Sequence, residues 1–286
     1  MTALGAAYAE CEARARSHYE NFPIGSWLLP RRLRQDLAAV YAFARLGDDV
    51  ADEGDATPAE RVARLDELEG RLEACAHDPE ASSDAVFLAL GHTIAHHELP
   101  LQPFLDLLTA FRRDATGETR RFATFADVLE YCRCSANPVG RIVLGLFGHR
   151  DDERAARSDD VCTALQLTNF WQDVRNDFIE RDRIYIPAED LDRFAGSRDA
   201  LASGRTTAAL RECMAFEVAR TRARFESGLR LAGLVDGRLR REVRLFAHGG
   251  LAILDRIEEH DYDVLAHRPR LGRGDLARLV WKELWR

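Results

Sequence analysis

The sequence predicts an all-α fold, and three observations favour it. Apolar residues recur at three- and four-residue spacing through most of the chain, which is the period of an amphipathic helix. The alternation that is typical of strands is confined to one short segment, Arg183–Pro187. No repeat, low-complexity tract or linker interrupts the 286 residues. We therefore expect residues 1–286 to form a single all-α domain of about ten helices.

Proline, glycine and their polar neighbours divide the helical pattern into segments. The start of one helix is well marked, because Thr57 is a good N-cap, Pro58 follows it and Glu60 can complete a capping box. The segments with the clearest helical period are Arg34–Asp52, Pro58–Ala76, Asp84–Glu98, Phe125–Phe147, Arg154–Asp177, Thr206–Leu234 and Arg238–Leu265.

The composition is that of a globular protein, with 46% hydrophobic and 31% charged residues. Acidic residues outnumber basic ones by 48 to 40, for a formal net charge of -8. Nucleic-acid-binding proteins usually carry a basic excess, so we expect no nucleic-acid partner.

The cysteines and the apolar runs indicate a cytoplasmic protein. The six cysteines are irregularly spaced in a long chain, which favours buried, reduced thiols over a disulfide framework. Residues Met1–Glu10 do not have the pattern of a signal peptide. The longest apolar run, Ile142–Phe147, is far shorter than the roughly 20 residues that span a bilayer. A peripheral membrane contact stays open.

Two Asp-x-x-x-Asp elements, Asp48–Asp52 and Asp173–Asp177, are the most informative feature of the sequence. A chain of this composition would contain about as many Asp-x-x-x-Asp elements by chance. The evidence for a functional site therefore comes from the residues around each element. On an ideal helix, Tyr41 and Arg45 share one narrow stripe with the two aspartates of the first element. The residues between them are mostly apolar.

The second element has the same organisation. Gln166 and Asn169 share a helical stripe with Asp173 and Asp177, and apolar or aromatic residues fill the remaining circumference. Both acidic stripes are therefore expected on helices that are largely buried.

Buried carboxylates must be paired or must bind cations. Arg45 can pair with one of these aspartates, not with four. Facing acidic stripes without nearby His or Cys favour Mg²⁺, which commonly completes its coordination with substrate phosphate and water. The implied ligand is a diphosphate. The spacing leaves one alternative open, in which the aspartates are solvated and paired with nearby arginines.

Four ordered motifs resemble those of the squalene and phytoene synthases over roughly residues 18 to 265. They are the strings Tyr41–Glu53, Tyr131–Arg141, Gln166–Asp177 and Arg183–Pro187. The resemblance implies a helical isoprenoid synthase bundle with a central cavity open at one end.

The resemblance also implies roles for individual residues. Asp48, Asp52, Asn169, Asp173 and Asp177 are expected to hold three Mg²⁺ ions that grip a prenyl diphosphate. Arg45 and Tyr41 would contact that diphosphate, and Asp49 would support the metal ligands. The further residues expected to bind substrate are Asn21, Phe22, Tyr131, Asn137, Gln166, Asn169, Arg183 and Tyr185.

Within this family, three strings resemble the hydroxysqualene synthases of bacterial hopanoid pathways. They are His18–Pro23, Ser135–Pro138 and Asn169–Asp173, and Gly249–Ile257 adds to the likeness. This branch ionises presqualene diphosphate and captures the rearranged cation with water. Gln172 stands where many family members carry Arg, so the diphosphate contact usually assigned to that position is in doubt.

Two other functions stay open. One is a head-to-head condensation that makes presqualene diphosphate, squalene or phytoene from two prenyl diphosphates such as farnesyl diphosphate. The other is a non-enzymatic family member, although such a protein would be expected to lose some of the aspartates. The sequence determines neither the oligomeric state nor any partner enzyme.

A carbocation needs an apolar cavity, and aromatic faces can stabilise it. Asn137 and Asn169 are candidates for holding the attacking water. For each candidate for the cavity lining, the sequence favours an ordinary core residue; the candidates are Phe22, Trp27, Leu37, Phe43, Phe104, Phe170 and Trp171.

Overall fold

The computed structural model describes residues 2–17 and 30–284, and the regular elements in these residues are all helices. The all-α prediction is confirmed for this part of the chain. The expected strand at Arg183–Pro187 is reduced to one parallel bridge between Arg121 and Ile184. Three residues named above, Asn21, Phe22 and Trp27, lie outside the described residues.

The chain divides into two compact units, Met1–Glu118 with Pro138–Asp151, and Thr119–Asn137 with Asp152–Arg286. We describe each unit by itself. That residues 1–286 form a single domain stays a prediction.

The first unit is built around the aromatic side chains of three helices. Phe43, Phe87 and Phe104 are fully buried, and the Phe43 ring centroid lies 6.1 Å and 5.8 Å from the other two, edge to face. These contacts hold α2 against α4 and α5. The helices are α1 (Ala3–Ser17), α2 (Arg31–Asp52), α3 (Pro58–His77), α4 (Ala85–His97), α5 (Gln102–Thr116) and α7 (Asn137–Leu146), which begins at the unit boundary.

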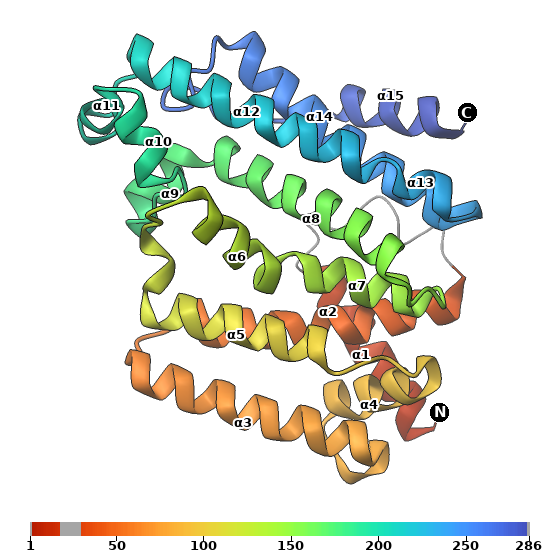
Figure 1. Cartoon of the computed structure of the whole chain (residues 1–286). Coiled ribbons are helices and arrows are strands. Elements are labelled where there is room, and N and C mark those ends of the chain that lie inside the picture. The colour runs from red at the N-terminus through yellow and green to blue at the C-terminus, as the bar shows by residue number, and fades with distance from the viewer. Residues whose placement is uncertain (1, 18–29, 285–286) are drawn as a thin grey trace. The chain divides into compact units, whose positions relative to one another are not determined.

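The second unit is organised around α8 and α12, which run side by side in opposite directions (Figure 1). Gly250 lets α14 approach this pair closely, because a Cβ there would lie 2.3 Å from the Phe225 ring. The helices are α6 (Phe125–Ser135), α8 (Asp152–Gln172), α9 (Val174–Arg181), α10 (Ala188–Arg193), α11 (Ser197–Ser203), α12 (Ala208–Gly228), α13 (Leu231–Leu234), α14 (Gly237–Glu259) and α15 (Arg273–Leu284).

Most of the expected helices are present, and the N-terminus of α3 has the predicted capping box of Thr57 and Glu60. The expected helix Phe125–Phe147 is instead two helices that meet at Ala136. Pro138 explains the break, because it has no N–H to donate to the carbonyl four residues earlier.

Two other expected helices are also broken, and α14 is shorter than predicted. The span Arg154–Asp177 bends at Asp173, whose φ and ψ are −108° and 13°. The span Thr206–Leu234 is interrupted after Gly228, and α14 ends at Glu259 instead of Leu265.

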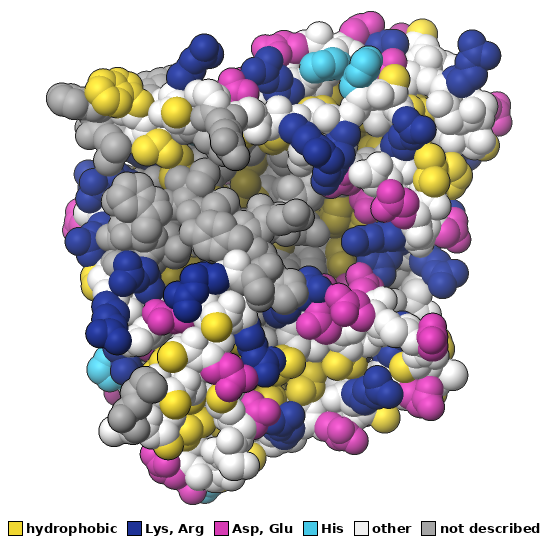
Figure 2. All heavy atoms as spheres, turned by 180° about the vertical axis from the view of Figure 1, so that it is seen from behind, with side chains coloured by type: hydrophobic (Ala, Val, Ile, Leu, Met, Phe, Trp, Pro, Cys, Tyr) yellow, Lys and Arg dark blue, Asp and Glu magenta, His cyan; other side chains and the backbone are white. Residues whose placement is uncertain are grey.

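Acidic and basic side chains are mixed on the face of the protein shown in Figure 2. Ion pairs between such neighbours are frequent; Arg112, for example, binds both Asp66 and Glu69. All six cysteines are free, and five of them are buried, as expected. Among the described residues, no helix has the length and apolarity needed to cross a bilayer.

Candidate functional site

The first aspartate motif lies at the C-terminal end of α2. The helix buries Phe43, Gly47 and Ala51, so the acidic stripe lies on its less buried side, as the sequence pattern predicted. The carboxylates themselves are more exposed than predicted. The Asp48 side chain is 46% exposed, and Asp52 is exposed.

Arg45 lies at the centre of this stripe and contacts three carboxylates, of which only Asp48 is one of the four predicted metal ligands of the aspartate motifs. Its Nη1 donates to Asp48 Oδ2 at 2.9 Å, and its Nη2 donates to Glu53 Oε1 at 2.8 Å. Its Nε is 2.6 Å from Asp49 Oδ1, and both atoms are buried in an alignment that does not form a hydrogen bond. One guanidinium thus serves several acids near the negative end of a helix.

Negative charge remains in excess around the motif. Burial raises the pKa of Asp48, and the nearby charge of Asp52 raises it further, although Arg45 opposes both. Burial also raises the pKa of Tyr41. A carboxylate whose pKa is raised by burial and by a neighbouring carboxylate is a donor that a divalent cation would stabilise, so these residues fit Mg²⁺ chemically.

Arg61, from the first turns of α3, holds the chain just after this motif. It donates to the carbonyls of Gly54 at 2.7 Å and Ala56 at 3.0 Å, and it also contacts the Ala51 carbonyl. These carbonyls lie at and after the last turn of α2, where backbone acceptors need partners. Arg61 was not among the predicted site residues, because no local sequence pattern links it to the aspartates.

The second motif continues from α8 through the bend into α9. Gln166 is half-buried and Asn169 is exposed. Across the bend, the Asp173 amide donates to the Asn169 carbonyl at 3.0 Å, and the Asp177 amide donates to the Asp173 carbonyl at 2.9 Å. The predicted register therefore survives, but the prediction of one straight helix is wrong at Asp173.

The two aspartates of this motif have different surroundings. Both Asp173 oxygens accept hydrogen bonds from Arg268, one of them at 2.9 Å from Nη2. Burial raises the pKa of Asp177 to about 6, and the charge of Asp173 contributes, while Arg181 and Arg183 oppose the shift. Arg183 is half-buried near Asp177, and Arg268 was not identified from the sequence.

Two of the predicted substrate-binding tyrosines are part of one aromatic cluster. The Tyr185 ring stacks on Phe170 with a centroid distance of 3.7 Å, and Tyr131 lies 6.3 Å from each of these rings. Phe122 adds a fourth ring, 5.9 Å from Tyr185. Tyr185 is only 7% exposed, so its ring is part of this cluster rather than an open lid. Three sequence motifs thus meet here.

Asn137 lies at the boundary between α6 and α7 and is buried. Its Oδ1 accepts a hydrogen bond of 2.9 Å from the Thr163 hydroxyl of α8. The contact fixes the orientation of a residue that was expected to bind substrate or water.

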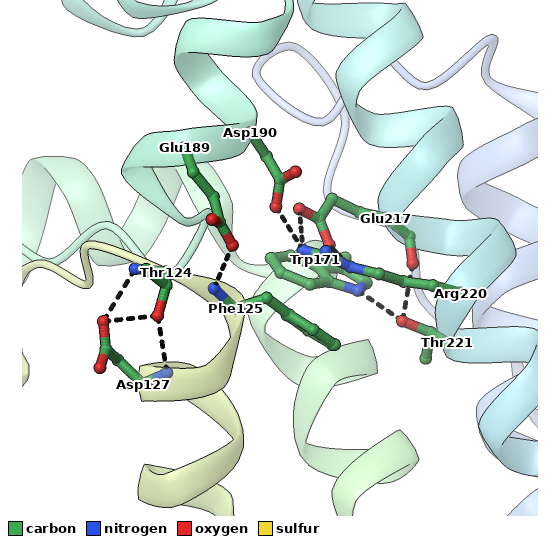
Figure 3. A network of polar contacts seen from close by, with 9 residues as sticks. All are labelled: Thr124, Phe125, Asp127, Trp171, Glu189, Asp190, Glu217, Arg220 and Thr221. Atoms are coloured by element: carbon green, nitrogen blue, oxygen red, sulfur yellow. Dashed lines mark hydrogen bonds and ion pairs between the residues drawn. The ribbon is translucent and has the colours of Figure 1, made fainter.

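Figure 3 shows the polar network around Trp171, which lies two residues before Asp173 in the sequence. Trp171 Nε1 donates to the Thr221 hydroxyl at 2.8 Å, and Arg220 bridges Glu217 and Asp190 at 2.6 Å and 2.7 Å. Burial raises the pKa of Glu217 even though Arg220 opposes the shift.

Arg220 also packs 3.4 Å from the centroid of the Phe125 ring. The network therefore fixes the end of α8 immediately before Asp173, and Trp171 belongs to the core rather than to a cavity lining. The same correction holds for Phe43 and Phe104, which fill the core of the first unit.

The structure brings residues together within each of the two motifs. In the residues it describes, no three side chains of His, Cys, Asp or Glu are grouped to hold an ion. Arg45 and Arg268 neutralise the aspartates in the arrangement described above.

The chain is similar to several known proteins. The hydroxysqualene synthase of Sinorhizobium fredii is 36% identical over 225 residues, which cover 78% of this chain and 74% of that protein. The phytoene synthase of Mycobacterium tuberculosis is 33% identical over 246 residues, covering 83% and 77%.

A solved structure, that of the squalene synthase HpnC from Alicyclobacillus acidocaldarius, shares 43% identity with a TM-score of 0.84. The match covers 91% of this chain and 99% of that chain. The squalene/phytoene synthase family model matches residues 15–275. The chain therefore belongs to the squalene/phytoene synthase family.

Proposed function

We propose that this protein converts presqualene diphosphate to hydroxysqualene in a Mg²⁺-dependent reaction. The observation that carries the proposal is the pair of acidic motifs, in each of which burial and one neighbouring aspartate raise the pKa of a second aspartate. Relatives named hydroxysqualene synthase, at 32% to 36% identity, support this branch of the family.

The proposed metal ligands are Asp48 and Asp52 in one motif, and Asn169, Asp173 and Asp177 in the other. Bound Mg²⁺, three ions by family resemblance, would neutralise the charge that develops on the leaving diphosphate. Arg45 and Tyr41 contact the phosphate oxygens and orient them, and Arg183 and Gln166 add polar contacts.

In the reaction, the carbon–oxygen bond to the diphosphate breaks and its electron pair leaves with the diphosphate. The cation rearranges, and a water oxygen bonds to carbon with loss of one proton. The aromatic cluster of Tyr131, Phe170 and Tyr185 excludes other water from the cation. Asn137, oriented by Thr163, is the proposed holder of the attacking water.

The test is turnover of presqualene diphosphate with Mg²⁺ in oxygen-labelled water and without a nicotinamide. We expect labelled alcohol from the wild type and no turnover from Asp48→Ala or Asp173→Ala. Asp55→Ala and Asp199→Ala remove exposed acids outside the motifs and should retain activity. Unlabelled alcohol, or full activity of either motif variant, would contradict the proposal.

A second candidate is the head-to-head condensation of two prenyl diphosphates, favoured by relatives named phytoene synthase at 33% identity. Incubation with farnesyl diphosphate and Mg²⁺ tests it directly. Formation of presqualene diphosphate or a longer hydrocarbon from that substrate would support condensation, and an unchanged substrate would exclude it for farnesyl diphosphate.

A further inference from the structure

The chain segment after α14, residues 261–272, is tied to the second aspartate motif by side-chain contacts. Gln172 Nε2 donates to the Pro269 carbonyl at 2.5 Å, and Arg175 Nη1 donates to the Leu265 carbonyl at 3.3 Å. Arg268 donates hydrogen bonds from Nε and Nη2 to the two carboxylate oxygens of Asp173. Contacts from Gln172, Asp173 and Arg175 thus place this segment beside the end of α8 and the start of α9.

The guanidinium of Arg268 has the position that a cation would need at Asp173. A planar guanidinium that binds both oxygens of a carboxylate uses the same lone pairs that a metal ion would use. The Arg268 side chain is 41% exposed and the Asp173 side chain 22%, so the guanidinium has room to turn toward solvent.

The backbone around Arg268 is anchored more firmly than its side chain. Pro269 is buried, and its carbonyl is held by Gln172. Gln172 therefore has a defined contact, and that contact fixes the residue next to Arg268. Rotation of one side chain is enough to free Asp173 without moving the segment.

We propose that Arg268 is a reversible competitor for the cation at Asp173, and that Gln172 positions it. The inference rests on the proposed function, in which Asp173 is a metal ligand. Arg268 neutralises Asp173 when no cation is bound, and it turns away when one binds. The consequence is a weaker resting affinity for the cation at this motif.

The test measures Mn²⁺ binding to the purified full chain by electron paramagnetic resonance, so it needs no turnover. Arg268→Gln should bind Mn²⁺ about three- to tenfold more tightly than the wild type, the range set by a partly exposed ion pair. Arg268→Lys keeps the charge but not the two-pronged contact, so its gain should be smaller. Gln172→Met keeps the side-chain length without the donor and should bind about twofold more tightly.

The matched control is Arg270→Gln, which removes the same charge from an exposed position of the same segment. Its affinity should stay within about twofold of the wild type, because exposed charges are well screened. Equal affinities for Arg268→Gln and Arg270→Gln, or weaker binding by Arg268→Gln, would overturn the competition.

Asp173→Asn separates this inference from the proposed function. If Asp173→Asn binds Mn²⁺ as tightly as the wild type, Asp173 is not a ligand and both proposals fail. If Asp173→Asn loses affinity while Arg268→Gln gains none, the metal site stands and only the competition is wrong. Circular dichroism of each variant verifies that the helices are intact.

Discussion

The Arg45 guanidinium partly neutralises the carboxylates at the C-terminal end of α2. It binds Asp48 and Glu53 through hydrogen bonds and lies beside Asp49. Arg45→Lys keeps the charge but cannot reproduce this fork. We expect the variant to lose turnover equivalent to about 2–4 kcal/mol of transition-state stabilisation, the cost of losing one donor to developing charge.

The measurement is kcat with presqualene diphosphate under saturating Mg²⁺. Arg31→Lys is the matched control, because Arg31 is exposed at the opposite end of the same helix. A wild-type kcat for Arg45→Lys would remove Arg45 from the diphosphate contacts.

Glu242 is a buried residue whose ionisation lowers the stability of the folded state. It is 9% exposed, and neither carboxylate oxygen has a hydrogen-bond partner among the described residues. Burial raises its pKa from 4.5 to about 7. The folded state therefore favours the protonated form, so Glu242 costs no stability below pH 4.5 and destabilises increasingly as the pH rises to about 7.

Glu242→Gln removes this titration. Its free energy of unfolding in urea should match the wild type near pH 4 and exceed it by about 2–3 kcal/mol at pH 8. Glu226→Gln, an exposed change on α12, should give no such difference. A constant offset between Glu242→Gln and the wild type across this range would refute the assignment.

Two arginines that contact the aspartate motifs were not predicted from the sequence. Tyr41, Arg45 and the aspartates are recognisable because they share a helical period. Arg61 and Arg268 reach their motifs from other elements, 10 residues beyond Ala51 and 95 beyond Asp173. Since no periodic pattern relates such positions, their contacts appear only in the folded chain.

At the scale of the element, the helical period predicted most segments but not their interruptions. The break before Pro138 has a local chemical cause that the sequence contains. The bend at Asp173 has no proline or glycine beside it. At this bend Gln172 and Asp173 contact the 261–272 segment. Because these contacts involve residues far along the chain, the local sequence did not predict that the helix is interrupted here.

The glycine pair on α14 tests how closely the helices of the second unit pack. A Cβ on Gly250 would lie 2.3 Å from Phe225 and 3.1 Å from Leu165, whereas a Cβ on Gly249 would meet nothing within 4 Å. Gly250→Ala should therefore lower the free energy of unfolding by about 1–3 kcal/mol through overpacking. Gly249→Ala should leave it unchanged or raise it, because alanine favours helix. Equal thermal stability of the two variants would show that the packing tolerates the added methyl.

At the scale of the whole molecule, the family could be predicted from the order of four motifs, and the comparisons confirm it over residues 15–275. The reaction is a finer question, because relatives with different reactions have similar identities, 36% and 33%. Membership of the family indicates a diphosphate leaving group, but it does not indicate which product forms from the cation. In the proposed reaction the aspartates would act on the leaving diphosphate, whereas the product would depend on the apolar surroundings of the cation.

The proposed cation binding has a consequence for the stability of the whole chain. A ligand that binds only the folded state stabilises it by about 2.7 kcal/mol at a concentration one hundred times its Kd. Mg²⁺ together with inorganic diphosphate should therefore raise the melting temperature by several degrees, and either component alone should raise it less. Asp48→Ala and Asp173→Ala should each reduce the shift, whereas Asp199→Ala, an exposed acid on α11, should retain it. If one motif variant keeps the full shift, that motif does not bind the cation and diphosphate. If both variants lose it, both motifs contribute to binding the cation and diphosphate.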